Sequence, residues 1–178
     1  YALTCLLSVM SLNVYADTSI IEPITVNIKD KAALQRGARV YINYFAGCHS
    51  LRYVRYNSMA RDIGIVDAKG QVAENIVKRN FIFGQDKITD PIRTALSPKD
   101  AQEWFGITPP DLSLAARVYG PEGLYTFLLN FYQDNKRTWG TNNRYRPDTA
   151  MPNVLLPLQG TQTAFYRTQT VHTPQGTE

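Results

Sequence analysis

The sequence contains few of the residues that usually build metal sites and disulfide scaffolds. Its 178 residues include two cysteines, two histidines and three methionines. Two cysteines cannot make a disulfide-dense scaffold, and they cannot supply the four thiolates of a zinc ribbon. Two histidines exclude a histidine-rich metal site unless carboxylates supply most of the ligands. Few side chains are therefore available as metal ligands.

A concentration of positive charge is also missing. The 19 basic and 15 acidic residues give a formal net charge of +4, and both signs occur in both halves of the chain. Proteins that bind nucleic acid normally carry a dense stripe of Lys and Arg, which releases counterions from phosphates. The even distribution argues against nucleic acid as a partner and favours an ordinary solvated surface.

Residues 1–16 have the pattern of an export signal. They contain no charged side chain and end in Val14-Tyr15-Ala16, with small residues at the two positions that a signal peptidase reads. We therefore expect cleavage after Ala16 and one exported domain over 17–178, a length typical of a single domain. Cys5 lies in the signal, so the exported protein keeps one thiol in a compartment where disulfides persist.

Short helical patterns and long loops alternate through the exported part. We expect helices over residues 30–45, 53–63, 73–81, 97–105 and 122–132, with an extended segment before the first helix and a turn-rich region after the last. Loops this long in a compact domain usually enclose a ligand or a prosthetic group. The pattern predicts a mainly α fold in which a large prosthetic group supplies part of the interior.

The remaining cysteine lies in a five-residue motif, Phe45-Ala46-Gly47-Cys48-His49. This motif is one substitution away from C-x-x-C-H, the attachment sequence of c-type haem. There, two thiols add across the two vinyl groups, and the histidine binds the iron. Phe45 stands in the place of the first cysteine, so a single thioether, through Cys48, is all that can form. On these five residues alone, a buried thiol beside a hydrogen-bonded histidine is the simpler interpretation.

The surrounding sequence changes that interpretation. The segments that carry a family resemblance are, in order, 36–44, 52–57, 104–106, 109–113, 116–117, 124–128, 142–143 and 151–152. Together with the Cys-His pair, they resemble the haem domain of cytochrome c1 over roughly residues 30–160. The resemblance implies a cytochrome c-like domain of short helices and long loops wrapped around one haem c, attached by a single thioether.

The resemblance also implies a ligand set. His49 would be the proximal ligand, Met151 the distal ligand and Cys48 the covalent attachment. A histidine with a methionine gives six-coordinate, low-spin iron with a raised potential, because the neutral thioether favours the ferrous state. Such a site exchanges electrons and has no substrate-converting position of its own. Met59, the other methionine of the exported chain, lies in a predicted helix and is interpreted as core.

Narrower roles follow from the same resemblance. Pro110 and Tyr125 match positions that line the haem pocket, and Phe45 would pack against the porphyrin edge. Arg117 would balance a haem propionate. Ordinary packing of Pro110 and Tyr125, and a solvated surface position for Arg117, remain open alternatives.

The sequence departs from the family pattern at several pocket positions. Tyr119 stands where many relatives carry an arginine near the propionates. Relatives usually have Gly at the position of Ala150, His at that of Asn153 and Trp at that of Leu156. These departures could alter the haem potential, and they leave open a chain that has lost haem.

The function that the resemblance implies is electron transfer in a quinol–cytochrome c oxidoreductase, the cytochrome bc1 complex. The subunit would accept an electron from a Rieske iron-sulfur protein and pass it to a soluble or tethered c-type cytochrome, with cytochrome b as a further partner. It would be exported and face the periplasmic side of a bacterial inner membrane. No run of about 20 apolar residues follows residue 16. Either the sequence is a fragment without the family's C-terminal anchor or the variant is soluble, and the missing initial methionine favours a fragment.

Two alternatives come from other functional classes. One is a haem-free structural subunit of a respiratory complex. The other is a peroxidase-like enzyme, which requires that Met151 leave the iron position open. The enzyme is disfavoured because His172, the other histidine, lies in a remote polar tail and is not available to move protons at the site.

Overall fold

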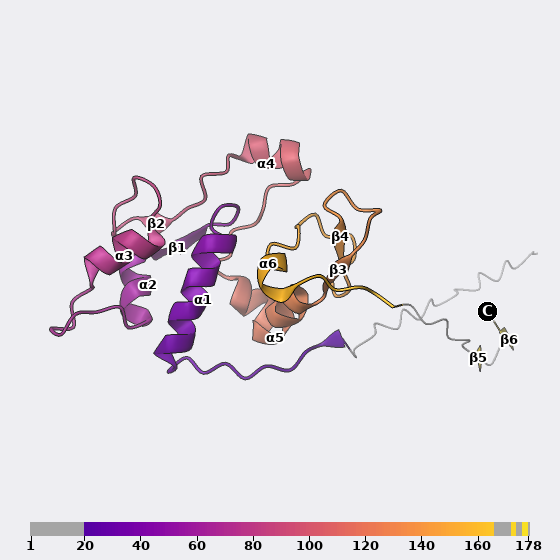
Figure 1. Ribbon diagram of the computed structural model, residues 1–178, viewed down its shortest axis with the longest axis horizontal. Coiled ribbons are helices and arrows are strands. Elements are labelled where there is room, and N and C mark those ends of the chain that lie inside the picture. The colour runs from indigo at the N-terminus through magenta and orange to yellow at the C-terminus, as the bar shows by residue number, and fades with distance from the viewer. Residues whose placement is uncertain (1–19, 166–171, 174–175, 178) are drawn as a thin grey trace, which may run out of the picture.

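The computed structural model describes residues 20–165, 172–173 and 176–177. The signal segment predicted at 1–16 lies outside the described residues. The chain forms two groups of elements (Figure 1). The first group contains α1 (Lys31–Tyr44), β1 (Leu51–Arg55), α2 (Tyr56–Asp62), α3 (Glu74–Phe81) and β2 (Pro91–Ile92). The second contains α5 (Ala115–Leu129), β3 (Phe131–Gln133), β4 (Thr141–Asn143) and α6 (Leu156–Gln159), with α4 (Pro98–Phe105) between the groups in the chain.

The first group has a continuous apolar core. Helices α1, α2 and α3 surround the antiparallel β1–β2 pair, and Ala60, Val77 and Ile92 are each 0% exposed. Met59 is 8% exposed in this core, where its helical setting predicted it. The core fixes the position of α1, and the Cys-His pair follows directly after that helix.

Local capping explains where two of the helices begin. The Asp30 side chain accepts a hydrogen bond from the backbone N–H of Ala33, so it caps α1 as the sequence predicted. Ser97 caps α4 through the N–H of Asp100, and Pro98 occupies the first helical position. Gly106 ends α4 in the left-handed conformation, with φ 71°.

The second group is packed around α5. The Phe127 and Phe131 rings meet edge to face, with centroids 5.1 Å apart. Thr126 is fully buried, and its hydroxyl accepts a hydrogen bond from the N–H of Glu22. The extended segment before α1 therefore runs from α5 to the start of α1 along one side of the molecule (Figure 1).

The mainly helical prediction is confirmed, but two helix boundaries differ. Residues 53–55 belong to β1, because Leu51 and Arg55 pair with Ile92 and Pro91; the helix begins only at Tyr56. The last long helix stops at Leu129, because residues 131–133 pair with residues 141–143. Short strands that depend on distant partners carry little local signal.

The same long helix also begins earlier than predicted. Helix α5 starts at Ala115 and continues across a kink at Gly120, which has φ 69° and ψ 161°. Pro121 follows the kink, where its missing N–H costs little because a new helical turn begins. The non-helical backbone at Gly120 therefore separates two helical segments, 115–119 and 121–129, which share the label α5.

The remaining elements are β5 (His172–Thr173) and β6 (Gly176–Thr177), a short antiparallel pair. His172 falls in β5, whose side chains lie outside the described part of the structure. Within the described residues, no helix combines the length and the apolar composition needed to cross a bilayer.

We predict that Ile92→Ala lowers the free energy of unfolding by about 2–5 kcal/mol, because the truncation leaves a cavity in the core. Ile28→Ala provides a matched control, because Ile28 is 71% exposed whereas Ile92 is fully buried. The control should change stability by about 0.5 kcal/mol or less. Urea denaturation measures both values, and equal losses would contradict the assignment of the core.

Candidate functional site

A tight turn after α1 holds the Cys-His pair. The N–H groups of Phe45 and Ala46 both donate to the carbonyl of Tyr41 as the helix ends. The N–H groups of Cys48 and His49 then both donate to the carbonyl of Phe45, at 2.9 and 2.8 Å. The chain therefore reverses over the motif, as the sequence predicted, and the two functional side chains begin from a hydrogen-bonded backbone.

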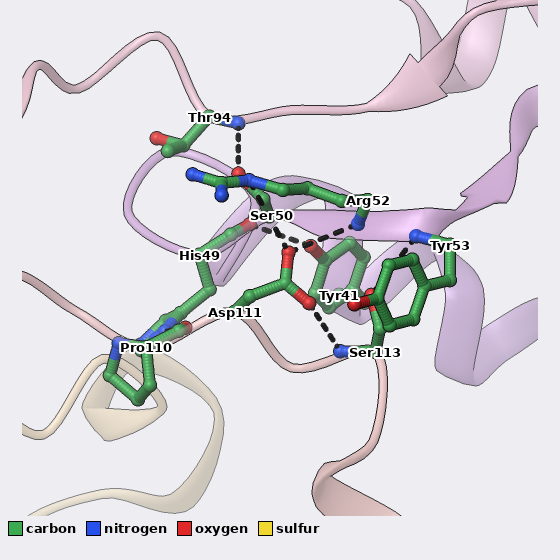
Figure 2. A network of polar contacts seen from close by, with 9 residues as sticks. All are labelled: Tyr41, His49, Ser50, Arg52, Tyr53, Thr94, Pro110, Asp111 and Ser113. Carbon is green, nitrogen blue, oxygen red and sulfur yellow. Dashed lines mark hydrogen bonds and ion pairs between the residues drawn. The ribbon is translucent and has the colours of Figure 1, made fainter.

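The imidazole of His49 is buried and held in one orientation. The side chain points toward Pro110 (Figure 2), and His49 is 8% exposed. Its Nδ1 lies 2.8 Å from the carbonyl oxygen of Pro110. Because a carbonyl can only accept, Nδ1 carries the proton and Nε2 presents its lone pair. No side chain or backbone group within residues 20–165 makes a hydrogen bond to Nε2, so that lone pair is available to a metal.

The carbonyl of Pro110 is placed by a carboxylate next to it in the chain. Asp111 accepts hydrogen bonds from the N–H of Arg52 at 3.0 Å and from the N–H of Ser113 at 2.9 Å. The hydroxyl oxygen of Ser113 in turn accepts from the N–H of Tyr53, at 3.1 Å. Figure 2 shows these contacts between β1 and the loop after α4. They fix the loop against the strand and hold the Pro110 carbonyl opposite His49.

The backbone around His49 has a second set of supports. The Tyr41 hydroxyl donates to the carbonyl of His49 at 2.7 Å. Ser50, which is 5% exposed, accepts from the N–H of Thr94, and the Thr94 hydroxyl donates to the carbonyl of Gly47. The turn is therefore held from the helix on one side and from the segment after β2 on the other.

Burial and hydrogen bonding shift three pKa values around the turn. Burial raises the pKa of the Tyr41 phenol far above its usual value, and the negative charge of Asp111 adds to the effect. Burial also raises the pKa of the Cys48 thiol, which is therefore neutral at physiological pH. Partial desolvation acts to raise the pKa of Asp111, but the hydrogen bonds from Ser113 and Arg52 outweigh it and hold that pKa below its usual value.

A hollow of about 340 Å³ adjoins the turn. Cys48, Leu96 and Pro109 contribute to its lining, together with Arg52 and Thr94. The thiol of Cys48 is unpaired and half-buried. Cys48 therefore borders open space, and it is the one predicted site residue that lines this hollow.

The other predicted site residues lie in the second group of elements, except for Phe45. Phe45 stacks on Tyr41 with the ring planes 4° apart and the centroids 6.3 Å apart. Arg117 and Tyr125 lie on α5, where Arg117 is exposed and Tyr125 is 38% exposed. Met151 is half-buried in the loop between β4 and α6.

Buried amides organise the segment that leads to Met151. Asn143 is fully buried, and its side-chain oxygen accepts from the N–H groups of Tyr145 and Arg146, both at 2.9 Å. Its side-chain NH₂ donates to the carbonyl of Phe127 on α5, at 2.7 Å. The loop is therefore tied to α5. In the view of Figure 1, α6, which follows the loop, is drawn between α1 and the β3–β4 pair.

The sequence did not indicate several of these supporting groups. Tyr41, Asp111 and Ser113 stood in family segments without an assigned role, and Ser50 and Thr94 carried no signal. Their partners are distant in the chain, so only the fold brings them together. Among the described residues, no three His, Cys, Asp or Glu side chains gather as a metal-binding group.

The donor set fits a haem that is bound covalently. A neutral imidazole with a fixed Nδ1–H and a free Nε2 is the form that ligates iron, and a carbonyl partner at the other nitrogen is typical of metal-bound histidines. The thiol directly before it borders a hollow and is positioned to form a thioether. These features define the class of c-type cytochromes.

The chain belongs to the cytochrome c1 family, whose sequence profile, described as "Cytochrome C1 family", matches residues 24–162. It is 42% identical to cytochrome c1 of Allochromatium vinosum over 156 residues, which cover 88% of this chain and 60% of the relative. It is 40% identical to a protein named ammonia monooxygenase gamma subunit of Nitrosomonas europaea, covering 75% of this chain and 53% of that protein. Membership in this family implies a covalently bound haem c.

A third relative is the cytochrome b/c1 of Bradyrhizobium diazoefficiens, which is 31% identical over 58% of this chain and 17% of the relative. The chain thus spans 60% or less of the length of each of these three relatives.

We predict that Asp111→Asn makes the free energy of unfolding less sensitive to acid. The folded pKa of Asp111 is lowered, so its stabilising contribution is complete above the unfolded pKa and is lost as the pH falls through the folded pKa. The variant should be less stable at neutral pH by about 1 kcal/mol, because an amide oxygen replaces a charged acceptor of two N–H groups. Its free energy of unfolding should also fall less steeply in acid.

Urea denaturation at a series of pH values measures both effects. Asp62→Asn is the control, because Asp62 is exposed and its carboxylate has no hydrogen bond within the described residues. Identical pH profiles for Asp111→Asn and the unsubstituted protein would show that the carboxylate does not hold the loop.

Proposed function

We propose that this protein is the electron-transfer haem c subunit of a quinol–cytochrome c oxidoreductase, exported as one domain over 17–178. The observation that carries the proposal is the 2.8 Å contact from His49 Nδ1 to the Pro110 carbonyl, which leaves Nε2 free. An imidazole in this form is suited to bind iron permanently. Family membership supports the choice of complex.

The chain's own residues perform separate tasks in this proposal. A bound haem supplies a one-electron carrier. His49 ligates it, and the Pro110 carbonyl makes the imidazole more basic and keeps the ring from rotating. Cys48 forms the covalent tether. The low exposure of His49 and Ser50 keeps water from the proximal side and lowers the local dielectric constant.

Met151 is the proposed distal ligand. The other methionine of the described residues, Met59, is buried in the core of the first group and is not available to the site. Pro152 restricts Met151 to extended backbone conformations, which suit a loop that presents sulfur to a metal.

A single thioether is the proposed attachment. In the described part of the chain, Cys48 is the one free cysteine. Phe45 takes the place of the motif's first cysteine, and its ring, stacked on Tyr41, offers a flat apolar surface for the edge of the macrocycle. Pro110 and Tyr125 are proposed to line the same pocket, with Arg117 beside a propionate.

The proposed partners follow from the complex. The subunit accepts an electron from a Rieske iron-sulfur protein, passes it to a soluble or tethered c-type cytochrome, and assembles with cytochrome b. It works on the periplasmic side of a bacterial inner membrane, held there by a C-terminal anchor typical of the family. These roles rest on family membership alone.

A pyridine haemochrome spectrum tests the proposal on protein matured with a c-type assembly system. The α band should lie between those of two-thioether haem c and unattached haem b, because one vinyl group remains. Phe45→Cys should move the band to the two-thioether position, and Cys48→Ala should release the haem in acidified organic solvent. Protein without any Soret band would instead support a haem-free structural subunit.

A further inference from the structure

A ring of polar contacts ties the Met151 loop to the turn between β3 and β4. Arg137 Nη1 lies 2.8 Å from Asp148 Oδ1, and Arg137 Nη2 donates to the Asp148 carbonyl at 3.0 Å. The N–H of Asp148 donates to the Asn142 side chain at 2.8 Å. Asn142 donates to Asp134 Oδ2 at 3.1 Å, and the N–H of Arg137 donates to the Asp134 carbonyl. These four residues form a closed ring.

The backbone at Asp148 requires such support. Among the described residues, Asp148 is the one non-glycine residue with positive φ, at 63°. Aspartate tolerates the left-handed region better than most residues, but the conformation still costs free energy and persists where surrounding contacts determine it. The chain turns here three positions before Met151. The conformation of Asp148 therefore sets the direction in which the loop approaches the site.

The Arg137 side of the ring is anchored. Its side chain is 34% exposed, whereas that of Asp148 is 72% exposed. In the same turn, Trp139 packs against Phe105 of α4, with ring centroids 5.3 Å apart. The turn also closes on itself, because the N–H of Asp134 donates to the Gly140 carbonyl and the N–H of Gly140 donates to the Arg137 carbonyl. Arg137 is thus a fixed point to which the more exposed Asp148 is attached.

The two contacts give this exposed ion pair a defined geometry. Isolated exposed ion pairs contribute little, but an arginine that makes two contacts with one partner is held in a defined geometry. Asn142, the next member of the ring, is 7% exposed, so its side-chain oxygen offers Asp148 a fixed and desolvated acceptor. The loop therefore has one favoured position.

We propose that Arg137 is a positioning residue for the distal ligand: with Asp148 and Asn142 it holds the loop so that Met151 stays on the iron. This inference rests on the proposed function, in which Met151 is the sixth ligand. Arg137 acts on the ligand through the loop. Its removal lets the loop move and weakens the bond to Met151.

Imidazole binding to the ferric, haem-loaded protein tests the proposal, because imidazole must displace Met151. The shift of the Soret band measures the affinity. Arg137→Ala should bind imidazole about fivefold more tightly, a change equivalent to about 1 kcal/mol. Its haem midpoint potential should also fall. Arg137→Lys should give an intermediate affinity, since lysine keeps the charge without the two-pronged geometry.

Two further substitutions complete the test. Lys78→Ala is the matched control, because it removes an ion pair to Glu74 on α3 while leaving the loop untouched; its imidazole affinity should equal that of the unsubstituted protein. Asp148→Asn keeps the residue's tolerance of positive φ and the contact of Arg137 to its carbonyl but removes the ion pair, so its imidazole affinity should lie between those of the unsubstituted protein and Arg137→Ala. The double variant should add nothing beyond Arg137→Ala.

The outcomes separate this proposal from the proposed function. Met151→Ala should lose the far-red charge-transfer band of a thioether-ligated ferric haem and bind imidazole most tightly of all. An unchanged band in Met151→Ala would reject Met151 as the ligand. If Met151→Ala behaves as expected, while Arg137→Ala keeps the affinity of the Lys78→Ala control, the positioning role of Arg137 is wrong. Additive effects of the Arg137 and Asp148 changes would also overturn it.

Discussion

The hydrogen bond from His49 to the carbonyl of Pro110 joins the first group of elements to the loop that leads into α5 of the second group. The two residues are 61 positions apart in the chain. Around this bond, the N–H of Leu112 donates to the Ser50 carbonyl, and Asp111 accepts from the N–H of Arg52. The contacts that orient the proximal histidine are thus also contacts that hold the two groups together, so a shift of one group changes the ligand geometry.

The two proposed ligands are held by different means. His49 follows α1, which packs on the apolar core of the first group, and the carbonyl of Pro110 fixes the orientation of its ring. Met151 lies in a loop whose shape depends on buried amides and on the Arg137–Asp148 pair. The proximal side is therefore rigid, while the distal side has a defined but more easily opened position. This asymmetry suits a site in which the covalent tether, through Cys48, is also on the proximal side.

The sequence predicted the parts that depend on local signals. The Asp30 and Ser97 caps, the turn at the Cys-His pair and the loop before α5 all follow from residues within a few positions of one another. It did not predict β1, because residues 53–55 take strand geometry from Pro91 and Ile92. It did not predict the role of Asp111 or Arg137 either, since their partners become neighbours only in the fold. For the site, the Cys-His pair carried its own signal, whereas the groups that orient it did not.

The central claim is that one imidazole, His49, and one thioether sulfur, Met151, occupy the two axial positions of a single haem. Near-infrared magnetic circular dichroism of the purified ferric protein identifies the two ligands of the haem iron directly. The account predicts one low-spin species with the charge-transfer energy of histidine–methionine ligation. A band at the energy of two nitrogen ligands, or a high-spin spectrum with an open sixth position, would contradict it.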